Sequence, residues 1–181
     1  EPTMPEKEGI VDRNRLLDIH GRRRNQQMAL AKEFSINDYP CPAGGCLLTD
    51  KGFSARLKDL LKYKPDYDIN DLHLLKIGRH FRISDNLKFI VGRDGKENEK
   101  LMDLSEKGDF IFDILDIPSA VGLAGGKASG KDIETMASIL TRYSDSDGKS
   151  AVVSYKILPS QEWKNMSAMP ANKDLLSSIR I

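Results

Sequence analysis

The chain of 181 residues contains few cysteines and histidines, the residues that mark disulfide-rich and metal-binding proteins. Its two cysteines are too few for a disulfide framework, and they lie five positions apart, which matches no CxxC metal pattern. The three histidines show no metal-ligand spacing with one another or with the cysteines. No apolar run approaches the about 18 residues of a membrane span, and the acidic start lacks the basic and apolar parts of a signal peptide. We therefore expect no metal site, no membrane partner and a cytoplasmic location.

An excess of charge of one sign is also missing. The 28 Lys and Arg residues are balanced by 27 Asp and Glu residues, which leaves a formal net charge of +1. A surface that attracts nucleic acid everywhere is therefore excluded, and any nucleic-acid interface must be a local patch. The length allows one good-sized core or two small ones, since domains of roughly 100 to 150 residues are commonest.

The hydrophobic pattern divides the chain near residue 68. Residues 22–34 and 50–63 predict two helices, with Asp50 as the cap of the second. The polar, proline-containing segment 64–71 then indicates a boundary. We expect a small helical segment over residues 1–68 and a β-rich domain over residues 69–181.

The second half alternates short apolar runs with helical segments. Residues 72–83 and 87–91 predict the two strands of a hairpin. The segments that follow predict helix, strand, strand, helix and strand over residues 94–104, 109–115, 120–124, 131–143 and 150–157. This ββαββαβ order favours an α+β fold with a mixed β-sheet and two helices over a doubly wound parallel sheet.

Cys46 is the one candidate nucleophile, since no Ser-His-Asp order with an elbow sequence is present. It follows Gly44 and Gly45 and precedes a segment with helical periodicity. Backbone N–H groups at a helix start stabilise a thiolate, and the glycines leave space for a substrate. The alternative is a small buried hydrophobic residue in a Gly-Pro turn, because free cysteine is often buried.

Residues 125–131 fit most of a Walker A loop, G-x-x-x-x-G-K, between a predicted strand and a predicted helix. Asp132 stands where a Ser or Thr would bind magnesium, which argues against nucleotide hydrolysis. Backbone N–H groups together with Lys127 and Lys131 still suit a phosphate, including one of an RNA backbone. The alternative is a solvated turn.

Residues 76–82, KIGRHFR, alternate cations with an aromatic ring on a predicted strand. Because RNA bases stack on arginine planes and exposed rings, Arg79, His80 and Arg82 are candidate RNA contacts. Alternate residues of a strand face opposite sides, so Phe81 could instead belong to the core face. Both alternatives stay open from the sequence alone.

The first half of the chain carries a resemblance to a known family. A basic helix over residues 22–34 is followed by the segment 43–46, Ala-Gly-Gly-Cys, and then by Leu47, Leu48, Phe53, Arg56 and Leu57. In this order residues 10–61 resemble the closing part of the ATP-dependent tRNA thiolation enzymes of the PP-loop class. In 2-thiouridylases of that class, a cysteine at the position of Cys46 takes part in persulfide sulfur transfer, so the resemblance implies that role here.

The second half resembles another family. The pattern consists of Val91-Gly92-Arg93, then Asn98-Glu99 with Leu101, residues 109–112, the step at residues 117–118, and Ala137, Tyr143 and Ser144. It is similar to the RNA-binding domain called NFACT-R over about residues 75–158, known from ribosome-associated quality control and also fused to predicted thiolation enzymes. The resemblance implies RNA contacts at Arg93 and Asn98. The chain departs from the family pattern at Phe112-Asp113 and at residues 119–121, where the family has histidines.

The SGGxDS-like ATP-binding segment of PP-loop enzymes is missing from the sequence. We therefore expect the C-terminal piece of a longer thiouridine-forming protein, with no cofactor in this piece and ATP bound by the full-length protein. The expected partners are tRNA and a sulfur donor protein. The alternative is a non-catalytic RNA- or ribosome-binding module of the quality-control type.

Overall fold

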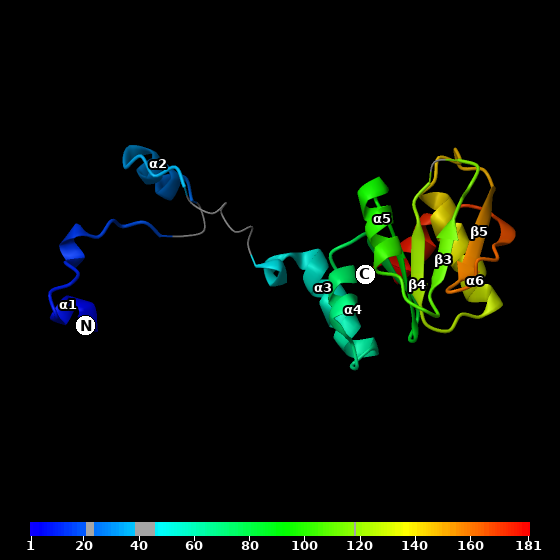
Figure 1. Ribbon diagram of the computed structural model, residues 1–181, viewed down its shortest axis with the longest axis horizontal. Coiled ribbons are helices and arrows are strands. Elements are labelled where there is room, and N and C mark those ends of the chain that lie inside the picture. Colours follow the sequence, from blue (N-terminus) through cyan, green and yellow to red (C-terminus); the bar gives the residue numbers. More distant parts are fainter. Residues whose placement is uncertain (21–23, 39–45, 118) are drawn as a thin grey trace. The chain divides into compact units, whose positions relative to one another are not determined.

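The computed structural model describes residues 1–20, 24–38, 46–117 and 119–181 (Figure 1). Its contacts divide the chain into two units, Glu1–Gly45 and Cys46–Ile181. No helix in the described ranges is long and apolar enough to cross a membrane.

The first unit contains short helices, α1 (Met4–Lys7), the 3-10 helix η1 (Arg13–Arg15) and α2 (Asn25–Glu33). The predicted helix over residues 22–34 is thus confirmed for α2. The apolar side chains of Met28 in α2 and of Phe34, which follows it, are 47% and 65% exposed. A helix buries an apolar stripe only against another apolar surface, and no residue of these three helices is buried.

The second unit is built on a six-stranded sheet in the order β1-β2-β4-β3-β5-β6. The expected α+β class is confirmed, but the sheet is not mixed, since every pair of neighbouring strands is antiparallel. The strands are β1 (Arg79–Ser84), β2 (Leu87–Val91), β3 (Phe110–Asp113), β4 (Gly122–Gly125), β5 (Ala151–Ile157) and β6 (Lys164–Ala168).

The two faces of the sheet carry different helices, because alternate side chains of each strand point to opposite sides. On one face, Phe81, Phe89 and Phe112 pack with Met136 and Leu140 of α6 (Gly130–Arg142) in the largest core cluster. The helix α7 (Lys173–Ile179) adds partly buried leucines to this cluster. Figure 1 shows α6 beside β3 and β5.

The other face has a smaller core. Here Ile90, Ile111 and Leu123 pack with Leu101 of α5 (Gly95–Asp103). A third cluster packs α3 (Lys51–Tyr63), through buried Phe53 and Leu60, against Leu75, the residue that follows α4 (Ile69–Leu74). The predicted division of the chain at residue 68 stays a prediction, and α3 and α4 on either side of it lie in one compact unit.

Two parts of the second unit differ from the prediction. The expected strand over residues 72–83 begins only at Arg79, because Asp68 and Asp71 form a reciprocal cap that starts α4. In that cap the Asp71 N–H donates to Asp68 at 2.9 Å and the Asp68 N–H donates to Asp71 at 3.0 Å. After β5 the chain adds β6 and α7, which extends the predicted ββαββαβ order by one strand and one helix.

Candidate nucleic-acid interface

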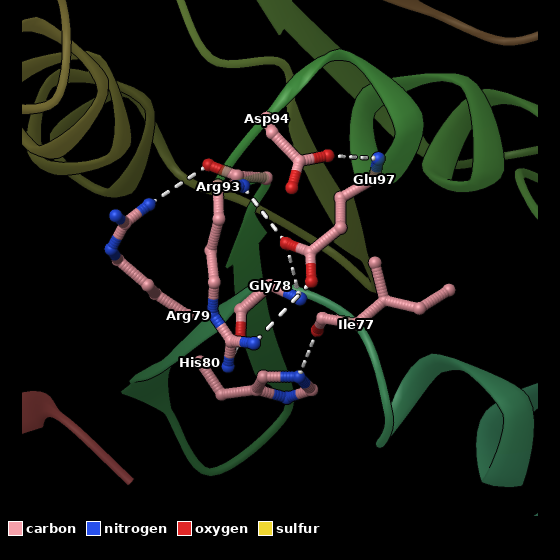
Figure 2. Close-up of polar contacts among 8 residues, drawn as sticks. Ile77, Gly78, Arg79, His80, Arg93, Asp94 and Glu97 are labelled. Carbon is pink, nitrogen blue, oxygen red and sulfur yellow. Dashed lines mark hydrogen bonds and ion pairs between the residues drawn. The ribbon is translucent and has the colours of Figure 1, made fainter.

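The side chains of Arg79 and Arg93 connect the two strands at the open end of the β1–β2 hairpin (Figure 2). Arg79 begins β1 and pairs with Val91, the last residue of β2, so the two arginines meet at one end of the hairpin. Arg79 Nη1 donates to the Gly92 carbonyl at 3.0 Å, and Arg93 Nη2 donates to the Gly78 carbonyl at 2.8 Å. Each guanidinium group is therefore held by main-chain oxygen across the hairpin.

Glu97 ties the first turn of α5 to the same place. Its Oε2 accepts from the Gly78 N–H at 3.2 Å and from the Arg93 N–H at 2.9 Å, and its Oε1 accepts from Arg93 Nη1 at 3.3 Å. Asp94 caps the helix by accepting from the Glu97 N–H at 2.9 Å, as Figure 2 shows. Glu97 is not among the site residues expected from the sequence, although its spacing of four residues from Arg93 is typical of an ion pair.

The Arg79 guanidinium also lies over an aromatic ring. Its Cζ is 4.7 Å from the ring centroid of Tyr143, the residue that follows α6. A guanidinium group has five N–H donors, and hydrogen bonds to described residues use one donor of Arg79 and two of Arg93. The side chain of Arg93 is 45% exposed. Two cations are thus fixed in place with donors left for a phosphate, which planar guanidinium groups bind in bidentate fashion.

His80 lies inside the domain rather than on this surface. It is 1% exposed, and its Nε2 is 2.7 Å from the Ile77 carbonyl, to which it donates a hydrogen bond (Figure 2). Its Nδ1 is buried without a hydrogen-bond partner among the described residues. Burial lowers the pKa of His80 well below its usual value, and the nearby charge of Lys88 lowers it further. The imidazole ring is therefore neutral at pH 7, and its burial keeps it from contacting a base of RNA.

Asn98 also serves the fold. Its Oδ1 accepts from the Val121 N–H at 3.0 Å, and its Nδ2 donates to the Ser119 carbonyl at 3.3 Å. A Cβ atom at Gly92 would come within 2.1 Å of Asn98 Oδ1, so only glycine fits there beside this side chain. The Val-Gly-Arg and Asn-Glu pattern therefore has a structural role at the hairpin end.

Arg82 lies on the opposite face of β1 from Arg79, because three positions separate the two residues. Both oxygens of Asp59 in α3 accept from Arg82, from Nε at 3.1 Å and from Nη2. The two side chains are 16% and 10% exposed. Arg82 Cζ is also 4.6 Å from the ring centroid of Tyr63. This predicted RNA contact joins α3 to the sheet.

Lys127 and Lys131 are exposed in the loop after β4 and in the first turn of α6. The helix begins with a reciprocal cap in which the Ser129 N–H and hydroxyl donate to Asp132 at 2.8 and 2.7 Å. These bonds hold the pKa of Asp132 below its usual value. Asp132 thus occupies the position of the Walker A Ser or Thr because it completes the cap of α6. With a carboxylate in place of that hydroxyl, the loop does not fit magnesium and nucleotide.

The candidate RNA contacts do not form a single site. Arg79 and Arg93 mark the open end of the β1–β2 hairpin, whereas the lysine-bearing loop adjoins its turn. A Cβ atom at Gly126 would lie 2.3 Å from the carbonyl of Asn86 in that turn. Any RNA that contacts both must cross the length of the hairpin, about 3.3 Å per residue.

Cys46 is exposed and precedes a three-residue 3-10 helix, η2 (Leu47–Thr49). The buried alternative is thereby wrong for this residue. Asp50, not Cys46, caps α3, since it accepts from the Phe53 N–H at 2.6 Å. Cys41 and the glycines before Cys46 lie outside the described residues. Within the described ranges, no group of three His, Cys, Asp or Glu residues could hold a metal ion.

The family model of the NFACT protein RNA binding domain matches residues 78–179. Because this match covers more than half of the chain, the chain belongs to that family. The matched segment contains all six strands together with α5, α6 and α7. Family membership indicates RNA as the partner. The match does not extend to residues 10–61, whose resemblance to thiolation enzymes stays a prediction.

Among solved structures, the C-terminal part of the fibronectin/fibrinogen-binding protein from Streptococcus suis is similar, with a TM-score of 0.51 at 15% identity. The similar region covers 58% of this chain and 49% of that chain, so this chain spans about half the length of that structure. At this identity the similarity concerns the fold alone. A search of curated proteins found no match.

Proposed function

We propose that this chain is an RNA-binding module that holds tRNA through phosphate contacts of its NFACT-R domain. The observation that carries the proposal is the arginine pair at the hairpin end, Arg79 and Arg93. Their guanidinium groups are fixed by main-chain carbonyls inside the family-matched segment and keep unused donors. A side chain that is already ordered loses less entropy when it binds a phosphate.

The exposed Lys127 and Lys131 extend the same function near the hairpin turn. Lysine supplies a mobile point charge for a phosphate, whereas the arginine pair supplies a fixed fork. Contacts of this kind neutralise phosphates and release counterions, so the affinity must fall as salt rises. Base contacts through His80 and Asn98 receive no support, since both side chains are used within the domain.

The test measures binding of the full chain to labelled tRNA, to an unstructured RNA of the same length and to intact ribosomes. The proposal expects binding to both free RNAs at about 50 mM salt, with tighter binding to tRNA because a folded RNA presents phosphates in a fixed arrangement. Equal affinity for the two RNAs would show that the chain does not prefer tRNA to other RNA. Binding to intact ribosomes without binding to either free RNA would favour the quality-control module, and no binding to any of the three at low salt would refute the proposal.

A sulfur-transfer role for Cys46 is a second candidate, which its exposed thiol favours. In this candidate function Cys46 carries a persulfide received from a sulfur donor protein, and a longer protein supplies the ATP site. The test follows alkylation of Cys46 against pH, with peptide mapping to separate it from Cys41. An activated thiol reacts well below pH 8.5, about the pKa of a free cysteine. A midpoint at about that value would count against the sulfur-transfer role.

A further inference from the structure

The helix α3 lies outside the family-matched segment and presents two lysines to solvent. Phe53 and Leu60 on one side of α3 are buried, whereas Lys58 and Lys62 are exposed. The two lysines are one helical turn apart, which puts their Cβ atoms about 5–6 Å apart. That spacing is close to the distance between successive phosphates of a nucleic-acid strand.

α3 is attached firmly to the RNA-binding domain. The ion pair between Asp59 and Arg82 is largely shielded from solvent and joins the middle of the helix to β1. Tyr63 lies under the Arg82 guanidinium, at 4.6 Å, and under Lys62 Nζ, at 4.5 Å from the ring centroid. The lysines of α3 therefore keep a defined position relative to the sheet.

The lysines border an open groove of about 410 Å³ between α3 and residues 178–181, which comprise the end of α7 and the two residues that follow it. The two residues after α7 run along β1, since Arg180 bridges to Phe81 and the Ile181 N–H donates to the His80 carbonyl at 3.0 Å. The charged side chains of the groove are Lys58, Asp59, Lys62, Arg82 and Arg180. Because Asp59 and Arg82 neutralise each other, three cationic side chains are left to face the groove.

The neighbouring hollow has the opposite charge. It lies between α3, α4 and the sheet, with a volume of about 420 Å³, and shares Tyr63 and Arg82 with the groove. Its charged lining consists of three cationic residues and six acidic ones, Asp66, Asp68, Asp71, Asp85, Glu106 and Asp109. A polyanion is repelled by this hollow and attracted by the groove.

We propose that this groove binds the phosphate backbone of RNA, with Lys58 and Lys62 each neutralising one phosphate. The proposal rests on the RNA-binding function proposed above. It assigns to α3 a share of the RNA surface that the family-matched segment does not contain. The RNA then contacts the side of the domain next to β1 as well as the hairpin end.

The test compares the full chain with K58Q/K62Q and with the matched control K149Q/K164Q. Lys149 and Lys164 are also exposed, and Lys164 lies on β6, at the opposite edge of the sheet from β1. Each lost phosphate contact lowers the slope of log affinity against log salt by about 0.7 for single-stranded and about 0.9 for duplex nucleic acid. We expect a decrease of about 1.4 to 1.8 for K58Q/K62Q and none for the control.

The outcomes separate this proposal from the one on which it rests. If the unmodified chain binds RNA and K58Q/K62Q keeps its full slope, the groove is not an RNA site although the domain binds RNA. An equal decrease in both double variants would also overturn the proposal, because it would show a general charge effect. If the unmodified chain binds no RNA, the proposed function itself has failed.

Discussion

Arg79 and Arg93 each donate a hydrogen bond to the carbonyl of the residue that precedes the other. The two bonds cross the β1–β2 hairpin just where its strand pairing ends. Beyond the last paired residues, these arginine side chains thus replace the main-chain hydrogen bonds that join the two strands. The relationship makes both arginines part of the fold and, at the same time, fixes two guanidinium groups on an RNA-binding domain, that of Arg93 beside Glu97.

Replacing Arg93 separates these two roles. R93Q removes the guanidinium fork that donates to both the Gly78 carbonyl and Glu97, and should lower the free energy of unfolding by about 1–2 kcal/mol. R93K keeps a charged donor beside Glu97 and should be less destabilised. R93K keeps the charge, whereas R93Q loses one phosphate contact and should lower the salt slope of RNA binding by about 0.7. Urea unfolding and RNA titration of the folded variants measure the two effects. Identical salt slopes for R93K and R93Q would show that Arg93 touches no phosphate.

Gly92 should tolerate no side chain. In G92A the added Cβ atom would meet Asn98 Oδ1 at 2.1 Å and displace its bonds, so we expect a loss of about 2–4 kcal/mol. Gly95 is the matched control, because a Cβ atom there meets nothing within 4 Å. G95A should be neutral or stabilising by up to about 1 kcal/mol in α5. Chemical denaturation of both variants decides, and equal stability of the two would contradict the packing described.

His80 predicts a pH dependence of stability. The folded state keeps the ring neutral, whereas the unfolded chain binds a proton below about pH 6.5. Because the unfolded state then binds more protons, protonation of His80 favours unfolding. The free energy of unfolding is therefore unaffected by His80 above about pH 6.5 and decreases as the pH falls below it, by at most about 1.4 kcal/mol per pH unit. H80Q should lose this dependence, and parallel stability curves for both proteins between about pH 6.5 and 5 would refute the assignment.

Asp132 offers a direct test of the incomplete Walker pattern. D132S completes the G-x-x-x-x-G-K-S pattern but removes the carboxylate that accepts from Ser129. We expect a loss of about 1 kcal/mol from the helix cap and no binding of ATP with magnesium. Thermal unfolding and calorimetric titration with ATP check both statements. Tight ATP binding by the variant would show that the loop had been a nucleotide site with one changed residue.

Local signals in the sequence predicted much of the fold. Asp50 caps α3 as expected, and the short apolar run over residues 87–91 and the β-branched run over residues 150–157 form the strands β2 and β5. The apolar run over residues 72–83 was misassigned at its start because the Asp68 cap that begins α4 was overlooked. The edge strand β6 was missed because the largely exposed residues 164–168 lack a clear apolar alternation.

The candidate site was less predictable, because sequence spacing does not reveal tertiary partners. Arg82 and His80 sit in a cationic pattern, yet one is bound by Asp59 from α3 and the other by the Ile77 carbonyl. The sequence marks Arg79 and Arg93 as candidate RNA contacts, but it does not reveal that each donates a hydrogen bond to the strand that carries the other. Only the folded chain shows which positive charges are left for a ligand.

The most direct test of RNA binding is a titration of labelled tRNA with the full chain at salt concentrations from about 50 to 200 mM. The proposed contacts use Arg79, Arg93, Lys127 and Lys131 together with Lys58 and Lys62. Six phosphate contacts predict a slope of log affinity against log salt of about −4 for single-stranded regions and about −5 for duplex. Absent binding at about 50 mM salt, or an affinity that does not change with salt, would contradict the account.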